Sequence, residues 1–280
     1  MPLLKRRRCW LPSNLSTRRQ HKVEFRLLSL AFLIGLSANA TGAPAKPLRV
    51  AIAPDLIPPF QVLGRRFQAI TGVPVQLIPS ASGILAQQIE HGAPYDLFAA
   101  ANVAYVQRLT NEKLTLPGSQ HLYAVGSLVL WRPPQVGAPL HSLSELLSPQ
   151  IHRIAIANPK IAPYGAAAQQ ALMKSGLWNR LRARIVYAEN VEQAYQYVKT
   201  GNADAALLPL SLVISEVGKK GDTQFYRVPP SLYSPINQAV AVIAITRQPA
   251  MALRFLHFLL GKPGRLVLKR YGFKLPPPPK

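Results

Sequence analysis

The alternation of short apolar segments with segments of helical periodicity, along residues 48–271, most strongly limits how this chain can fold. Apolar runs of four or five residues predict buried strands. Apolar side chains at every third or fourth position, as at Phe60, Leu63 and Phe67, predict helices. Strands that alternate with helices favour sheets of parallel strands covered by helices. The predicted fold class is therefore α/β.

The alternation comes in two series, which predict two lobes. The predicted strands begin at Leu48 and then lie at 75–78, 97–100, 127–131, 154–157, 185–188, 205–208 and 237–246. The predicted helices lie at 58–71, 84–91, 103–110, 166–175, 191–200, 249–260 and 262–271. We assign residues 44–126 and 236–280 to lobe 1 and residues 127–235 to lobe 2. A cleft between the lobes, at the carboxyl ends of the strands, is where a ligand is expected.

Residues 1–43 predict a cleavable export signal. Eight basic residues precede the apolar run LLSLAFLIGLSANA, and Ala38 and Ala40 form an A-x-A cleavage pattern, with Ala43 as a second choice. The run is too short for an ordinary membrane-spanning helix. Sec export fits the segment better than twin-arginine export. We therefore expect a periplasmic protein whose mature chain begins between residues 41 and 44.

The charge balance of the mature chain favours anions. Removing residues 1–40, with eight basic and one acidic residue, leaves 25 basic and 10 acidic residues. Such an excess attracts anions at long range and would suit nucleic acid. Export and the scattered placement of the basic residues argue against nucleic acid, so a basic nucleic-acid-binding protein is a distant alternative. The only cysteine, Cys9, leaves with the signal, so the mature chain has no disulfide or cysteine metal ligand.

Three predicted helix starts carry residues suited to an anion. The first N–H groups of a helix lack partners and lie at the positive end of its dipole. Ser82 adds a hydroxyl at one such start, and the small Gly83 lets a ligand approach the backbone. In the second series, Tyr164 follows Pro163, which can start a helix, and Val191 follows Asn190, which can cap one. The alternative for Ser82 is an N-cap. Three junctions drawn from both lobes favour one shared anion site.

The chain also resembles the periplasmic molybdate-binding proteins. The resemblance rests on SASGILAQQIEHGAPYDLFAAAN, NPKIAPYGAAAQQAL, NADAALLPLSLV and RYGF, and covers residues 48–273. It implies a two-lobed type II periplasmic binding protein fold with the ligand cleft between the lobes. It further implies a monomer without cofactor or catalytic activity, which binds molybdate or tungstate and delivers it to the membrane permease of an ABC importer. The implied ligand positions are Asp55, Ser82, Tyr164 and Val191, with Gly83 permitting close approach.

Two positions depart from the family pattern. Asp55 stands where the family usually has Ser or Asn, and Pro209 stands near a point where some members have a tyrosine. An ionised carboxylate about 4 Å from one negative charge costs roughly 4 kcal/mol at a dielectric constant near 20. Asp55 could be protonated, could turn away to cap the 58–71 helix, or could face a ligand that carries a proton, such as phosphate or arsenate.

Other functional classes fit the sequence less well. His91, His121, His141, His152 and His257 show no metal-ligand spacing, and no nucleophile with an adjacent base is evident, so we expect no enzyme. A receptor for a cation or an organic ligand, with Asp55 facing positive charge, stays open. The identity of the ligand is therefore the main question that the sequence leaves.

Overall fold

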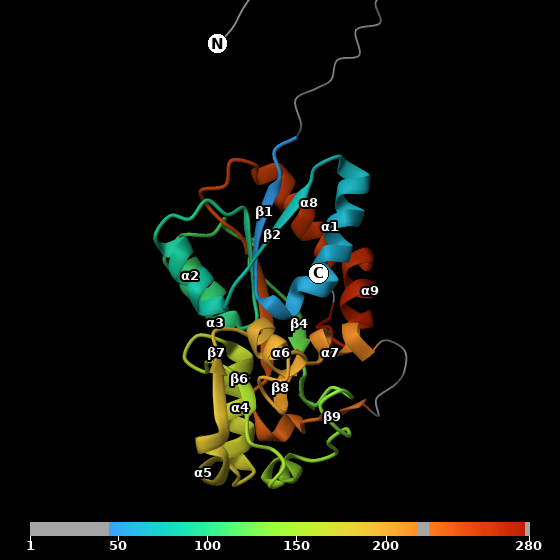
Figure 1. The fold of residues 1–280 in the computed structure, drawn as a ribbon. Coiled ribbons are helices and arrows are strands. Elements are labelled where there is room, and N and C mark those ends of the chain that lie inside the picture. The colour runs from blue at the N-terminus through green and yellow to red at the C-terminus, as the bar shows by residue number, and fades with distance from the viewer. Residues whose placement is uncertain (1–44, 218–223, 278–280) are drawn as a thin grey trace, which may run out of the picture. The chain divides into compact units, whose positions relative to one another are not determined.

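A computed structural model describes residues 45–217 and 224–277 of the chain, and the predicted export signal lies outside them. The described residues belong to one compact unit. It contains two five-stranded sheets, ordered β2-β1-β3-β10-β4 and β7-β6-β8-β5-β9. We call the first sheet with its helices the first lobe, and the second sheet with its helices the second lobe (Figure 1).

The first lobe is built on the earliest strands and the last one. Its strands are β1 (Leu48–Ile52), β2 (Val75–Pro79), β3 (Leu97–Ala100), β4 (His121–Gly126) and β10 (Ile236–Val242). Its helices are α1 (Ile57–Thr71), α2 (Ser82–Glu90), α3 (Val103–Asn111), α8 (Pro249–Leu260) and α9 (Lys262–Arg270). β3 is apolar and buried at every position, as expected for a strand covered on both faces. Helices α1, α8 and α9 lie on one side of the sheet, and α2 and α3 on the other (Figure 1).

The second lobe repeats this arrangement. Its strands are β5 (Leu128–Trp131), β6 (Ile154–Ala157), β7 (Ile185–Ala188), β8 (Ala205–Pro209) and β9 (Phe225–Arg227). Its helices include α4 (Pro163–Lys174), α5 (Trp178–Leu181), α6 (Val191–Lys199) and α7 (Leu210–Val217). Buried residues of α6 and α7 pack together with one face of the sheet, whereas those of α4 belong to the core on the other face.

The chain passes between the lobes at Ser127, which joins β4 to β5, and at residues 228–235, which join β9 to β10. The last long strand, β10, joins the first sheet. The expectation of parallel sheets is only partly right. Strands β1, β2 and β3 are parallel, and so are β6, β7 and β8, but β10 runs antiparallel to β3 and β4, and β5 antiparallel to β8 and β9. The antiparallel strands are those that flank the passages between lobes.

The described residues contain no helix long and apolar enough to cross a membrane. Within the same part of the chain, no three His, Cys, Asp or Glu residues gather where they could hold a metal ion.

Candidate functional site

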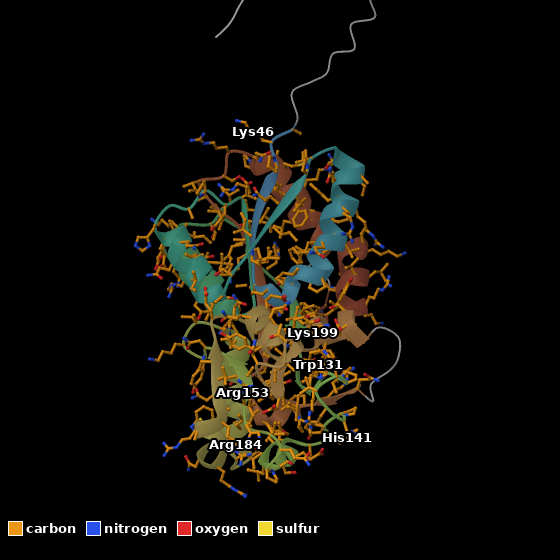
Figure 2. All side chains as sticks on the ribbon, in the orientation of Figure 1. Lys46, Trp131, His141, Arg153, Arg184 and Lys199 are labelled. Atoms are coloured by element: carbon orange, nitrogen blue, oxygen red, sulfur yellow. The ribbon has the colours of Figure 1, made fainter. Side chains whose placement is uncertain are left out.

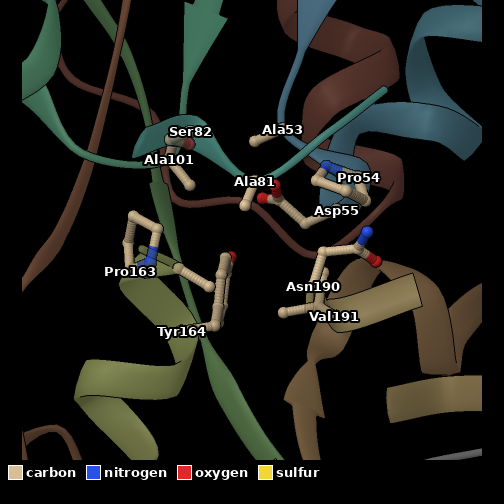
Figure 3. Close-up of a pocket in the computed structure, with 11 residues that line it drawn as sticks. Ala53, Pro54, Asp55, Ala81, Ser82, Ala101, Pro163, Tyr164, Asn190 and Val191 are labelled. Carbon is tan, nitrogen blue, oxygen red and sulfur yellow. The ribbon is translucent and has the colours of Figure 1, made fainter. Parts of the chain in front are cut away.

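A pocket lies where segments of the two lobes meet, and helix starts surround it (Figure 3). Its cavity volume is about 10 Å³. That room is about enough for one ordered water. The lining residues are Ala53, Pro54, Asp55, Ala81, Ser82, Ala101, Ala162, Pro163, Tyr164, Asn190 and Val191. Four of the five residues that the sequence nominates for the site are therefore together in one pocket.

Ser82 is the first residue of α2 and is 1% exposed. Its hydroxyl oxygen accepts a hydrogen bond from the Ala101 N–H at 3.1 Å. The N-cap of α2 is Ala81, with no side-chain cap bond, so the alternative in which Ser82 only caps its helix is wrong. Because an accepting hydroxyl keeps its own proton to donate, the side chain of Ser82 can still donate into the pocket.

Gly83 does not line the pocket. Its N–H donates to the Ile161 carbonyl oxygen of the second lobe at 3.1 Å, so this amide is occupied. A Cβ at this position would lie 3.1 Å from both that oxygen and the Tyr105 hydroxyl. The small size of Gly83 therefore serves the contact between the lobes, and the expectation that it opens a path for a ligand is corrected.

Tyr164 occupies the second position of α4, after Pro163. An N–H at that position has no acceptor within its own helix, which leaves the Tyr164 amide available to a ligand. The side chain is buried, and its hydroxyl accepts from Gln238 Nε2 at 3.3 Å. A Cβ on Gly126 would lie 2.0 Å from the Tyr164 hydroxyl oxygen, so the ring fits only because position 126 is glycine.

Val191 is the first residue of α6, and Asn190 is its N-cap. The Asn190 side chain accepts from the Gln193 N–H at 3.0 Å, as the sequence predicts for a cap. The cap satisfies the Gln193 N–H alone, and the earlier amides of α6, including that of Val191, have no acceptor within their own helix. A third helix thus presents its positive end to the same pocket.

Asp55 is fully buried, in the short 3-10 helix η1 (Pro54–Leu56) that precedes α1. Its Oδ2 accepts from Gln238 Nε2, and its Oδ1 has no hydrogen-bond partner. Burial raises the pKa of this carboxyl from 3.8 to about 6, against the lowering effect of the neighbouring Gln238 and Tyr164 side chains. The N-cap of α1 is Leu56, without a side-chain cap bond, so the alternative in which Asp55 caps that helix is wrong.

Gln238 of β10 is a site residue that the sequence analysis missed. It is fully buried, donates to Asp55 and Tyr164, and accepts from the Tyr123 hydroxyl at 2.9 Å. The available signal is a single amide inside the apolar run NQAVAVIAIT, because a polar side chain in such a run must find partners when buried.

Pro209 does not line the pocket. It is the last residue of β8 and pairs with Leu128 of β5. No Lys, Arg or His lies among the eleven lining residues. The basic residues labelled in Figure 2, Lys46, Arg153, Arg184 and Lys199, do not line the pocket. Helix dipoles and N–H and O–H donors are therefore the groups of this pocket that could attract an anion.

Two α/β lobes that enclose one pocket between their helix starts define a two-lobed solute-binding protein. Residues 48–274 match the family model for the bacterial extracellular solute-binding protein. The chain belongs to this family of bacterial extracellular solute-binding proteins.

Named relatives come from several bacteria. The chain is 34% identical over 253 residues to the molybdate-binding protein ModA of Azotobacter vinelandii, covering 90% of this chain and 100% of that protein. It is 33% identical to ModA of Rhodobacter capsulatus, covering 88% of this chain and 94% of that protein. The solved structure of the Azotobacter vinelandii periplasmic molybdate-binding protein matches with a TM-score of 0.75 and 33% identity, over 82% of this chain and 99% of that one.

Proposed function

We propose that this protein is the periplasmic solute-binding component of an ABC importer and that it binds a tetrahedral oxyanion of the molybdate or tungstate type. The observation that carries the proposal is the gathering of the α2, α4 and α6 starts around a pocket without cationic side chains. Similarity to proteins named for molybdate binding supports the choice of anion.

The donors in this proposal are uncharged. Ser82 donates from its hydroxyl and its N–H, and Tyr164 and Val191 donate from their backbone amides. Each replaces part of the water shell of the anion, and each helix start adds roughly 0.3 to 1 kcal/mol, or more where partly buried. Asp55, the only acidic residue among those that line the pocket, opposes an anion when it is ionised.

Ligand entry requires the lobes to separate, because the pocket has room for about one water molecule. Hydrogen bonds between the lobes hold the present arrangement. Among them are Gly83 N–H to the Ile161 carbonyl, at 3.1 Å, Ser211 Oγ to the Asp55 carbonyl, at 2.7 Å, and Gln238 Nε2 to the Tyr164 hydroxyl, at 3.3 Å. A ligand that contacts both lobes favours the closed state, because only differential contacts shift such an equilibrium.

The remaining parts of the proposal follow from the sequence and from the relatives. Residues 1–43 act as a removable export signal, and the mature protein works as a monomer that docks on the permease. The named relatives are binding proteins, and we propose binding without catalysis or a resident cofactor for this chain as well.

A thermal-shift screen of protein purified from the periplasm and dialysed free of oxyanions tests the proposal. Molybdate, tungstate, sulfate, phosphate, arsenate and ferric ion are compared at matched ionic strength. A ligand at about 100 times its Kd stabilises the folded state by about 2.7 kcal/mol, which raises Tm by roughly 5 to 11 °C for a chain of this size. We expect that rise with molybdate or tungstate. A rise in Tm with ferric ion alone would indicate that the ligand is a cation facing Asp55 and not an oxyanion.

A further inference from the structure

The Oδ1 atom of Asp55 is a buried polar atom that nothing in the described part of the protein satisfies. Figure 3 shows the Asp55 side chain directed into the pocket, beside Ala81 and across from Tyr164. The other oxygen, Oδ2, is already bound to Gln238. Buried polar atoms without a partner are rare in folded proteins, so Oδ1 is positioned to meet a group of the ligand.

The groups that face Asp55 are all uncharged. They are Gln238 from β10, Tyr164 from α4 and Tyr123 from β4, while Tyr233 lies beside Tyr164. Burial raises the pKa of both Tyr123 and Tyr164 well above the usual value, and the negative charge of Asp55 raises both further. These phenols therefore keep their protons at any physiological pH. No lining residue is cationic, so no side-chain charge in the pocket offsets an ionised Asp55 when an anion arrives.

We propose that Asp55 and the bound oxyanion share one proton, so that the ligand is held through an O–H···O bond between Asp55 Oδ1 and an oxyanion oxygen. This inference rests on the proposed function and names the protonation state of the complex. A fully ionised dianion, such as molybdate, binds together with one proton from solvent, which ends on the carboxyl of Asp55. A hydrogen-bearing dianion, such as hydrogen phosphate, brings the proton itself and donates it to the ionised carboxylate.

The proton changes the sign of the contact. An ionised Oδ1 can only accept hydrogen bonds and repels an anion, whereas a protonated Oδ1 donates in the same way as the Ser82 hydroxyl. Repulsion in a pocket without countercharge is weakly screened. The neutral acid is accessible, because burial already raises the pKa of this carboxyl to about 6 before any anion binds.

Calorimetry of molybdate binding in buffers of different ionisation enthalpy measures the protons taken up per ligand. With the pKa of free Asp55 at about 6, we expect roughly 0.9 proton per molybdate at about pH 7 and roughly 0.1 at about pH 5. The affinity should fall about tenfold per pH unit above about pH 7. Phosphate at about pH 8, if it binds, should bring its own proton and give an uptake near zero.

Asp55→Asn is the matched variant, since its amide keeps an acceptor for Gln238 and turns a permanent donor toward the pocket. It should bind molybdate with no proton uptake and with a Kd that stays constant within about twofold between about pH 5.5 and 8. The wild-type proton count stands without the variant, should the variant fold poorly.

The outcomes separate this inference from the proposed function. Molybdate binding by the wild type with no proton uptake and a constant Kd overturns the shared proton and leaves oxyanion binding intact. Equal proton uptake by Asp55→Asn assigns the proton to another group and also overturns the inference. Absence of molybdate and tungstate binding in both proteins at every pH overturns the proposed function itself.

Discussion

Replacement of Asp55 by Asn should stabilise the ligand-free protein increasingly as the pH rises. Burial raises the pKa of the Asp55 carboxyl from 3.8 to about 6 in the folded protein, so the folded state binds this proton more tightly than the unfolded chain does. Stability from this group is fully present below about pH 4 and is lost as the pH rises through about 6. Asn does not titrate, so the variant lacks this loss.

The magnitude follows from the two pKa values. Their difference corresponds to about 3 kcal/mol at 1.36 kcal/mol per pH unit. About 2 kcal/mol of this change falls between about pH 4.5 and 7.5. For a chain of this size, 1 kcal/mol moves Tm by about 2 to 4 °C. The Tm advantage of Asp55→Asn over the wild type should therefore grow by roughly 4 to 8 °C across that range, whatever fixed offset the substitution adds.

Thermal unfolding followed by circular dichroism, in buffers free of sulfate, phosphate and other oxyanions, measures this difference. Glu112→Gln, at an exposed position just after α3, is the control and should follow the wild-type curve. Parallel pH profiles for the wild type and Asp55→Asn would refute the reasoning, because they would mean that Asp55 does not titrate as a buried acid. A difference that shrinks with rising pH would refute the sign.

Three further substitutions test the site and its support. Ser82→Ala should weaken oxyanion binding about tenfold in calorimetry, the equivalent of about 1.4 kcal/mol, and equal weakening by Ser80→Ala, outside the pocket lining, would contradict the role of the hydroxyl. Gly126→Ala brings a Cβ to 2.0 Å from the Tyr164 hydroxyl oxygen. It should lower the free energy of unfolding in urea by about 1 to 3 kcal/mol. An unchanged urea midpoint would show that the Tyr164 ring moves freely. Phe255→Ala removes a fully buried ring that contacts two other phenylalanine rings. It should lower the free energy of unfolding by about 3 to 5 kcal/mol in the same urea assay and leave the ligand Kd of the folded protein unchanged. A higher Kd would contradict a purely structural role.

The sequence predicted the helices and strands whose signals lie within a few neighbouring residues. Strands such as LFAA and IAIA are short apolar runs, and α1 has apolar residues at helical spacing. The starts of α4 and α6 were also recognisable, from Pro163 and from the cap Asn190. These signals depend on residues within one turn or one strand, which is why a single sequence is enough to find them.

Elements that depend on distant parts of the chain escaped prediction. The strand β4, HLYAVG, begins with a histidine and takes its place only by pairing with β10. Helix α7 follows β8 directly in the apolar run AALLPLSLV, where periodicity cannot separate a strand from a buried helix. The antiparallel direction of β10 likewise depends on the whole sheet, because the residues of β10 do not specify that it pairs with β3 and β4.

The candidate site divides along the same line. Ser82, Tyr164 and Val191 could be found from sequence because an anion needs free amides, and helix starts supply them. The partner of Asp55 could not, because Gln238 lies 183 residues away.

Gln238 nevertheless contacts residues of both lobes at the candidate site. Its amide carries two N–H groups, and it donates to Asp55 of the first lobe and to Tyr164 of the second. The same side chain thus steadies the carboxyl that takes up the proton and ties the two lobes together. Protonation of Asp55 removes the negative charge that strengthens the hydrogen bond from Gln238 to Asp55. Under the shared-proton proposal, the proton that admits an anion therefore weakens a bond within the first lobe, and Gln238 connects that carboxyl to Tyr164 of the second lobe.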